Sequence, residues 1–223
     1  MTVPADQVVG SSEAIPMFPT FVWKYQLKES VYRDLNSRLL AAIDSMRPVN
    51  EPVPVGKAWQ TDQKLHRLAE FAELMEYFSS ATRGVLDVQK VAYESFEITG
   101  CWANIAARGA SHKPHCHPNN YLSGVYYVQA GKGANTITFI DPRIRRLVID
   151  PHMTSLDENN AGEITMEVKE GLIVVFPAWL VHSVGASTSE QERVSISFNI
   201  MFRQYAETMC YPKWQSTAWP EAF

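Results

Sequence analysis

"SHKPHCHPNNYLSGVYYV", residues 111–128, places three of the six histidines of the chain within six positions, directly before an apolar run. His115 and His117 are two positions apart, which points two side chains to the same side of a β-strand and turns Cys116 away. Two neutral imidazoles fixed in this way suit a divalent transition metal. An HxH pair also arises by chance, so a metal site requires at least one more ligand.

The segments around this stretch are short, rich in β-branched and aromatic residues, and separated by Gly, Pro, Asn and Asp. They read YESFEITGCWANI, YLSGVYYVQ, NTITFI, RRLVI, EITMEV, LIVVF, VHSVGA and RVSISFNIMF. Many short strands at a spacing of roughly ten residues are typical of a β-sandwich or barrel. The sequence therefore predicts a mainly β fold.

The N-terminal part has a different pattern. After a short strand, FVWKYQL, apolar residues recur at helical spacing over residues 28–46 and again over about 62–83, where Thr61 or Asp62 is a candidate cap. Three prolines predict a loop over 47–58 between the two helices. Neither helix buries its apolar face alone, so we expect both to brace the outside of the β-domain.

We expect one domain over residues 1–223. About 1–90 would supply the N-terminal strand and helical support, about 91–203 the β core, and 204–223 an aromatic tail. The tail carries Tyr205, Tyr211, Trp214, Trp219 and Phe223. This aromatic density favours burial, against the core or in a homodimer, over a role as a lid.

The overall composition excludes several classes of protein. A net charge of −4 gives a nucleic-acid partner little electrostatic support. Three widely spaced cysteines form no disulfide framework, which fits a reducing compartment. The N-terminus has no basic start followed by an apolar core, and no long apolar run predicts a membrane span. We expect a cytoplasmic protein with a small-molecule substrate, no nucleic-acid partner and no membrane contact.

A candidate third ligand lies in "GLIVVFPAWLVHSV", residues 171–184. A buried apolar strand turns at Pro177, and the chain re-enters the sheet with His182. Strands far apart in sequence meet when a barrel closes, so His182 can join the pair at His115 and His117. The alternative is an interior histidine with a structural hydrogen bond.

The strand that follows, RVSISFNI, separates polar from apolar residues. Arg193, Ser195, Ser197 and Asn199 alternate with Val194, Ile196, Phe198 and Ile200. One face therefore packs on the core, and the other lines a polar cavity or faces solvent. A guanidinium that binds a carboxylate through two hydrogen bonds, with a serine hydroxyl two positions on, suits a dicarboxylate whose other end reaches the metal.

The strings HCHPNNYLSGVYYV, FIDPR, FPAWLVHSV and RVSISFN resemble the iron(II)- and 2-oxoglutarate-dependent oxygenase superfamily. More narrowly, they are similar to a bacterial group of 2OG-Fe(II) oxygenases with an HxH…H…RxS pattern. The resemblance covers about residues 104–199. It implies a double-stranded β-helix (a cupin-like jelly roll), with Fe(2+), 2-oxoglutarate and O2 as cofactors. It also implies that His115, His117 and His182 bind the metal and that Arg193 and Ser195 bind 2-oxoglutarate.

The chain departs from the superfamily at one ligand. Where the broad superfamily has a carboxylate, this sequence has His117, so the triad resembles the three-histidine centres of cupin-type dioxygenases. The alternative third ligands are Asp141, for which we favour a structural role in a turn, and His112. We expect His112 to be solvated or to lie behind the ligands.

The resemblance further implies that Tyr127 hydrogen-bonds a carboxylate of 2-oxoglutarate and that Asn104 is a second polar contact. Tyr126 and Tyr127 could instead both be core residues whose hydroxyls find hydrogen-bond partners. Candidate contacts to the primary substrate are Asn199, Ser123, Trp179 and Arg143. Arg143, in a loop with two further arginines, is the candidate for attracting an anionic metabolite, although a solvated surface is the favoured interpretation.

By this resemblance the chain is a 2-oxoglutarate-dependent non-haem iron dioxygenase. It would hydroxylate, desaturate or cyclise an unactivated C–H position of a small molecule, with release of succinate and CO2. Two alternatives remain open. One is a cupin-like three-histidine dioxygenase or lyase that does not use 2-oxoglutarate, and the other is a non-catalytic jelly-roll module that binds metal.

Overall fold

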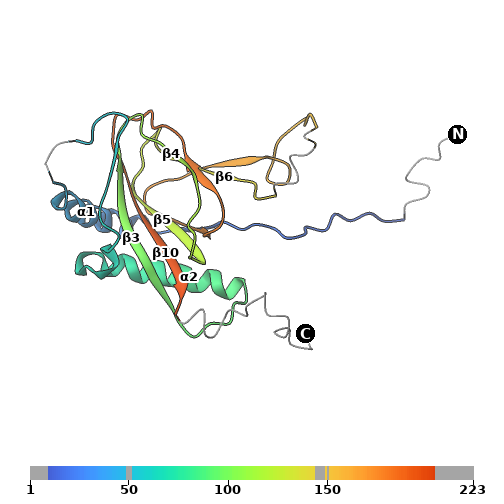
Figure 1. The fold of residues 1–223 in the computed structure, drawn as a ribbon, viewed down its shortest axis with the longest axis horizontal. Helices are drawn as coiled ribbons and strands as arrows, with labels where there is room; N and C mark the ends of the chain where they lie inside the picture. The colour runs from blue at the N-terminus through green and yellow to red at the C-terminus, as the bar shows by residue number, and fades with distance from the viewer. Residues whose placement is uncertain (1–9, 49–51, 144–148, 150, 204–223) are drawn as a thin grey trace.

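The computed structural model describes residues 10–48, 52–143, 149 and 151–203. Two antiparallel sheets face each other, with the strand orders β1-β8-β5-β10-β3-β2 and β4-β9-β6-β7 (Figure 1). The elements are β1 (Trp23–Gln26), α1 (Glu29–Ser45), β2 (Ala58–Gln60), α2 (Ala72–Val88), β3 (Phe96–Ala106), β4 (His112–His115), β5 (Leu122–Gln129), β6 (Thr136–Ile140), β7 (Glu163–Glu167), β8 (Leu172–Pro177), β9 (His182–Val184) and β10 (Arg193–Phe202), with two 3₁₀ turns, η2 (Leu65–Arg67) and η3 (Ala69–Phe71).

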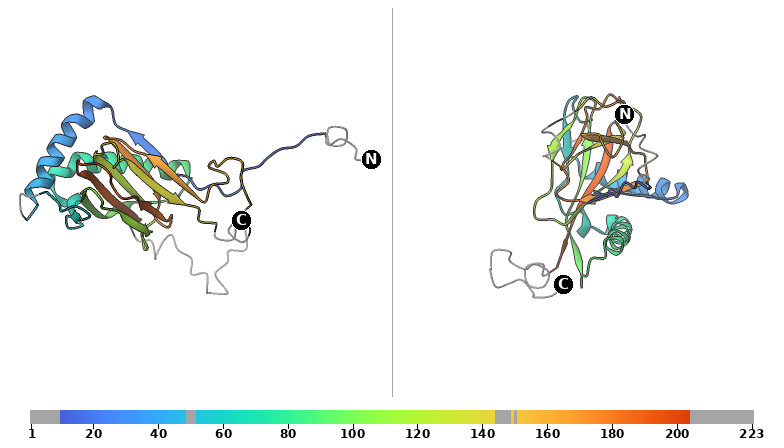
Figure 2. Two further views of the ribbon diagram at one scale, coloured as in Figure 1. Left: turned by 90° about the horizontal axis from the view of Figure 1, so that it is seen from above. Right: turned by 90° about the vertical axis from the view of Figure 1, so that its right-hand side faces the viewer.

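Both helices cover the outer face of the six-stranded sheet (Figures 1 and 2). The larger core cluster joins Leu35, Leu39 and Ile43 of α1, and Leu74, Phe78 and Val85 of α2, to alternate residues of the central strands. In β10 these are Val194, Ile196, Phe198 and Ile200. Because successive side chains of a strand point to opposite faces, this packing leaves the odd-numbered residues of β10 facing the second sheet.

A smaller apolar cluster fills part of the space between the sheets. It contains Val125, Ile137, Phe139, Val174 and Phe176, among others. Asn104, Ser195 and Arg193 are also buried. Burial of polar groups is costly unless they find partners, so their concentration here marks the interior of the sandwich as a functional region.

Helix α1 was predicted correctly, and it is joined to the sheet by a buried polar contact. The Tyr126 hydroxyl donates to Asn36 Oδ1 at 2.6 Å, and Asn36 Nδ2 donates to the Val128 carbonyl at 2.7 Å. The predicted alternative of a core tyrosine with a satisfied hydroxyl therefore describes Tyr126. Tyr127 points to the opposite face of β5.

The second helix was predicted correctly as an element, but its predicted bounds, about 62–83, were wrong. Residues 65–71 form two 3₁₀ turns, and α2 begins at Ala72 without a side-chain cap. The chain before these turns is held against β3, since the Cys101 amide donates to the Gln63 carbonyl at 3.0 Å. The helix also continues past Gly84, where the absence of a side chain lets the Tyr25 hydroxyl pack against it.

The predicted mainly β architecture with two bracing helices is confirmed. Most of the predicted strand RRLVI and the aromatic tail 204–223 lie outside the described residues. In the part of the chain that the structure describes, no helix has the length and hydropathy required to cross a bilayer.

A substitution at Gly124 in β5 tests the packing between the central strands and the helices. A Cβ at this position would overlap with the Phe198 ring and lie 2.9 Å from the Val174 carbonyl oxygen. The fully buried Phe198 ring stacks on Phe78 at 3.8 Å, so it has no room to move. We expect Gly124→Ala to lower the free energy of unfolding by about 1–3 kcal/mol in urea denaturation.

Gly100→Ala is the matched control, because it lies in the adjacent region of β3 and its added Cβ would meet nothing closer than 3.5 Å. We expect this change to alter the free energy of unfolding by less than about 1 kcal/mol. Equal effects of the two substitutions would contradict this description of the core.

Candidate metal centre

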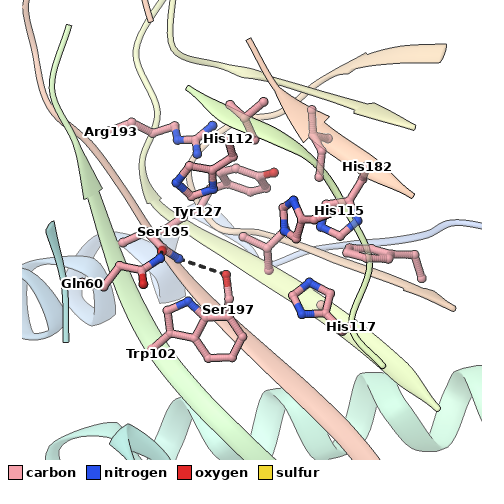
Figure 3. A pocket seen from close by; sticks show the side chains of 16 residues that line it. Gln60, Trp102, His112, His115, His117, Tyr127, His182, Arg193, Ser195 and Ser197 are labelled. Atoms are coloured by element: carbon pink, nitrogen blue, oxygen red, sulfur yellow. Dashed lines mark hydrogen bonds between the residues drawn. The ribbon is translucent and has the colours of Figure 1, made fainter. Parts of the chain in front are cut away.

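A cavity opens between the two sheets, at the polar face of β10. Its lining comes from strands distant in sequence: Gln60, Trp102, Asn104, His112, His115, His117, Gly124, Val125, Tyr127, Ile137, Phe176, His182, Val184, Arg193, Ser195 and Ser197. Figure 3 shows Arg193, His112 and Tyr127 together at one end, with the other histidines farther along. Arg193 is the only residue of this lining with a permanent charge.

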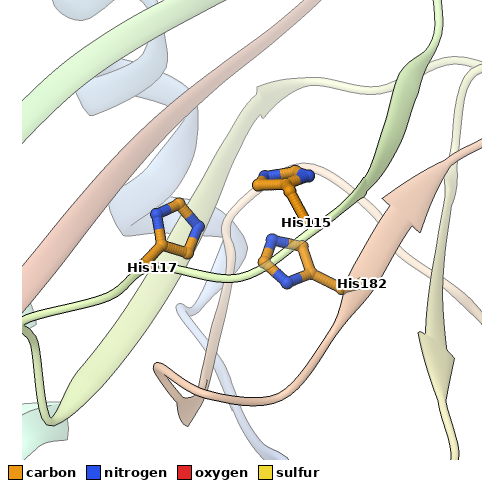
Figure 4. A group of neighbouring side chains, drawn as sticks. All are labelled: His115, His117 and His182. Atoms are coloured by element: carbon orange, nitrogen blue, oxygen red, sulfur yellow. The ribbon is translucent and has the colours of Figure 1, made fainter.

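His115, His117 and His182 form one cluster (Figure 4). Their ring centroids are 4.4 Å apart for His115 and His182, and 5.2 Å apart for each of the other two pairs. One ring nitrogen from each lies within 4.8 Å of the other two. Three nitrogen atoms at these separations can bind one divalent cation, and an imidazole set favours a transition metal such as iron or zinc.

The local backbone differs from the expected strand. His115 ends β4, and His117 lies beyond it, with its amide donating to the Ala178 carbonyl at 2.8 Å. His115 pairs with His182 across β4 and β9. The two histidines of the HxH pair are therefore not held by strand alternation. The turn between β8 and β9 holds His117, and the same turn leads into His182.

Backbone carbonyls fix the orientation of two of the rings. His115 Nδ1 lies 2.7 Å from the Lys113 carbonyl oxygen, and His182 Nδ1 lies 3.0 Å from the Leu180 carbonyl oxygen. A carbonyl only accepts hydrogen bonds, so each Nδ1 carries a proton, and in the neutral ring Nε2 is the nitrogen that can bind a metal. The carbonyl contacts thus fix which nitrogen of each ring faces a metal.

Burial also keeps two of these histidines neutral. It lowers the pKa of His117 to about 4, with a smaller contribution from the nearby His115. It likewise lowers the pKa of His182 to about 4, although the Leu180 carbonyl opposes this shift. Protons therefore compete weakly with a metal for these two nitrogens at neutral pH.

At the other end of the cavity, Arg193 is 5% exposed. Its Nε is buried without a hydrogen-bond partner, and within the described ranges no carboxylate forms an ion pair with the guanidinium. Burial lowers the pKa of Arg193, but an arginine remains charged in proteins. A buried cation without a counterion is costly, which indicates that an anion belongs beside it.

Tyr127 and Ser195 accompany this arginine. They pair across β5 and β10, and both are almost fully buried in the cavity lining. Among the described residues, neither hydroxyl has a hydrogen-bond partner. Two unengaged hydroxyls and a guanidinium can together bind a carboxylate.

Asn104, predicted as a further contact, is already engaged. It accepts a hydrogen bond from Gln60 Nε2 at 2.5 Å and donates to Ser197 Oγ at 3.0 Å (Figure 3). The three side chains form a polar row across β2, β3 and β10. Trp102 lies beside this row, with its ring 6.1 Å from that of His117.

The four residues predicted to contact substrate do not line this cavity. Ser123 donates to Asn199 Oδ1 at 2.7 Å, farther along the same sheet face. Trp179 is largely exposed and borders a separate surface hollow. Arg143 forms an ion pair with Asp141 at 2.9 Å. Asp141 also accepts the Arg143 amide, which agrees with the turn role favoured for it.

The sequence did not predict the place of three cavity residues. Gln60 ends the short strand β2, between the predicted loop 47–58 and the predicted second helix, and Trp102 gave no signal beyond its place in an apolar segment. His112 was not expected to line the cavity, but it is half-buried beside Arg193. Burial and the neighbouring guanidinium lower its pKa. Its position in the histidine-rich stretch was the available signal.

Comparison with known proteins agrees with this geometry. Residues 100–199 match the family model described as "Putative 2OG-Fe(II) oxygenase". The match spans all three clustered histidines and Arg193, and it ends at Asn199. None of the curated proteins matches the chain in sequence.

Solved structures share the fold at low sequence identity. A prolyl-4-hydroxylase from Pseudomonas putida is 16% identical, with a TM-score of 0.56 over 82% of this chain and 94% of that one. The α-ketoglutarate-dependent epimerase SnoN of nogalamycin biosynthesis is 14% identical, with a TM-score of 0.60 over 82% and 77%. HygX from Streptomyces hygroscopicus, crystallised with nickel and 2-oxoglutarate, is 10% identical, with a TM-score of 0.55 over 81% and 82%. The predicted jelly-roll architecture is confirmed.

The low pKa values of His117 and His182 predict a pH-dependent stability of the metal-free chain. In the unfolded chain these imidazoles have a pKa of about 6.5. As the pH falls from about 6.5 towards 4, the unfolded chain therefore takes up protons that the folded chain does not. Their contribution to stability is complete above pH 6.5 and declines below it.

Urea denaturation with a chelator present, at pH 7.5, 6 and 5, measures this effect. We expect His182→Gln to make the decline in the free energy of unfolding shallower. His152→Gln, at an exposed position, serves as the control and leaves the slope unchanged. If His182→Gln left the dependence of the unfolding free energy on pH unchanged, this would contradict the conclusion that His182 is neutral in the folded chain.

Proposed function

We propose, from the membership of residues 100–199 in the 2OG-Fe(II) oxygenase family, that this enzyme oxidises an unactivated C–H bond of a small molecule. Hydroxylation is the reaction we favour, with 2-oxoglutarate converted to succinate and CO2. The observation that carries the proposal is the buried, unpaired Arg193 in the same cavity as three clustered histidines.

Iron(II) and 2-oxoglutarate are the cofactors typical of this family, and the cavity residues fit both. His115, His117 and His182 would hold the metal through neutral nitrogens, which are suitable ligands for iron(II). When bound together, the two cofactors supply the oxidising power for C–H cleavage, with O2 as the oxidant. The protein supplies position, charge and exclusion of water.

We assign to Arg193 the carboxylate of 2-oxoglutarate that lies away from the metal. Its guanidinium presents parallel N–H donors that match the two oxygens of a carboxylate. We assign Ser195 and Tyr127 as further donors, because both hydroxyls are buried in the lining and unengaged. Asn104 would act indirectly, by fixing Ser197 and Gln60 along the neighbouring wall.

The remaining wall supports a primary substrate that is uncharged where it enters the cavity. Apart from Arg193 and the histidines, the lining is apolar or carries amide and hydroxyl groups. A buried charge without a partner on this wall would be strongly disfavoured. Trp102 offers a flat apolar surface near His117, and Gln60 offers hydrogen bonds at the more exposed edge.

Metal binding tests the assignment of the triad. We expect alanine at His115, His117 or His182 to weaken cobalt(II) binding at least tenfold in anaerobic titration, because each change removes one of three ligands. His152→Ala, which removes an exposed histidine, should leave the affinity within twofold. If one triad variant retained full affinity, that histidine would not be a ligand.

Anaerobic titration with iron(II) and then 2-oxoglutarate tests the proposed function. We expect a weak visible charge-transfer band, saturable in 2-oxoglutarate. Arg193→Ala should raise the dissociation constant for 2-oxoglutarate about 100-fold, because it removes two charge-assisted hydrogen bonds of about 1.5 kcal/mol each. Arg108→Ala, an exposed arginine paired with Glu190, should have no effect.

The two alternative functions give different results in the same experiment. A three-histidine enzyme that does not use 2-oxoglutarate would bind iron(II) without the band, and Arg193→Ala would change little. A non-catalytic module would hold zinc tightly and show no band, and in a separate assay with O2 it would produce no succinate. Either result in a folded protein overturns the proposal.

A further inference from the structure

His112 faces the cavity because of an irregularity in β4. Residues three apart in a regular strand point to opposite faces, so His112 and His115 should face different sides. Instead, His112 pairs with Val184 and His115 with His182, and the register shifts between them. Such a shift redirects a side chain, and both rings line the same cavity.

The position of His112 does not fit a metal ligand. Its ring centroid is 6.3 Å from that of His115, the farthest of the neighbouring histidine pairs. It is also absent from the group of three whose nitrogens lie within 4.8 Å of one another. His112 lies instead beside Arg193 and Tyr127 (Figure 3).

No structural hydrogen bond accounts for the orientation of His112 either. Among the residues that the structure describes, nothing bonds to its ring nitrogens, whereas His115 and His182 each bond to a backbone carbonyl. The side chain is half-buried and borders the space beside a guanidinium. Its N–H group is therefore available to a ligand.

We propose that His112 selects for a dicarboxylate cosubstrate, by donating a hydrogen bond to the same distal carboxylate that Arg193 binds. This inference rests on the proposed function. A carboxylate has about four acceptor positions, of which the guanidinium takes two. The imidazole N–H takes a third, and the Ser195 and Tyr127 hydroxyls share the fourth. A neutral imidazole also adds a donor without repelling the arginine.

Calorimetry on the full chain loaded with nickel(II), which does not support turnover, tests this role. The two probes are 2-oxoglutarate and 2-oxobutyrate, which share the 2-oxo acid end and differ only by the distal carboxylate. We expect His112→Leu to raise the dissociation constant for 2-oxoglutarate about tenfold. Its affinity for 2-oxobutyrate and for nickel(II) should stay within twofold.

Two further variants complete the experiment. His112→Gln keeps a neutral N–H donor and should recover part of the selectivity. Lys132→Gln removes an exposed charge from a turn outside the cavity lining and should leave both affinities unchanged. A circular dichroism spectrum and thermal midpoint matching those of the unaltered chain establish that each variant is folded.

The outcomes separate this inference from the proposed function. If the unaltered chain binds 2-oxoglutarate no more tightly than 2-oxobutyrate, the proposed function itself fails. If it prefers 2-oxoglutarate and His112→Leu preserves that preference, only the inference fails. Loss of nickel(II) affinity in His112→Leu would make His112 a metal ligand and would also overturn the inference.

Discussion

The pairing of β10 between β3 and β5 is the constraint on which the site depends. This strand has Val194, Ile196 and Phe198 in the helix-covered core and Arg193, Ser195 and Ser197 in the cavity. A shift of one residue would exchange the two sets and place a guanidinium in the apolar core. The register of one central strand therefore holds the core and the proposed cosubstrate site in place together.

In the proposed metal centre, a histidine at position 117 in place of a carboxylate would change the charge balance of the cavity. Three imidazoles that bind a metal as neutral ligands would contribute no charge, so Arg193 alone would give the cavity a formal charge of +1. A divalent cation raises this value to +3, and a dianionic cosubstrate reduces it to +1. A site with an aspartate ligand would be neutral at the same stage. This chain thus has a stronger electrostatic reason to bind anions, and burial strengthens it because water screens the charges less.

Much of the fold and part of the site could be predicted from the sequence. Alternation in RVSISFNI assigned the two faces of β10 correctly, because one face packs on the apolar core and the other lines a polar cavity, which leaves a clear period of two. Helix α1 was predictable for the corresponding reason at a period of 3.6. The start of α2 was not, because residues 61–64 pair with β3 and override local helical preference. The residues that line the cavity were hardest to predict, because they come together only in the folded chain. Gln60, for example, contacts Asn104 only when β2 pairs with β3.

The buried charge of Arg193 also needs a rigid support, and the residue before it supplies one. Glu192 accepts hydrogen bonds from Arg47 and from the Val53 amide, each at 2.7 Å, and its carbonyl accepts one from Gln129 at 2.6 Å. These contacts join the end of α1, the following loop and β5 at a single point. Because the backbone is held there, the guanidinium can remain without a partner in the free protein and bind an anion with little loss of conformational entropy. The end of α1 and the loop that follows it thus also support the strand that carries the guanidinium.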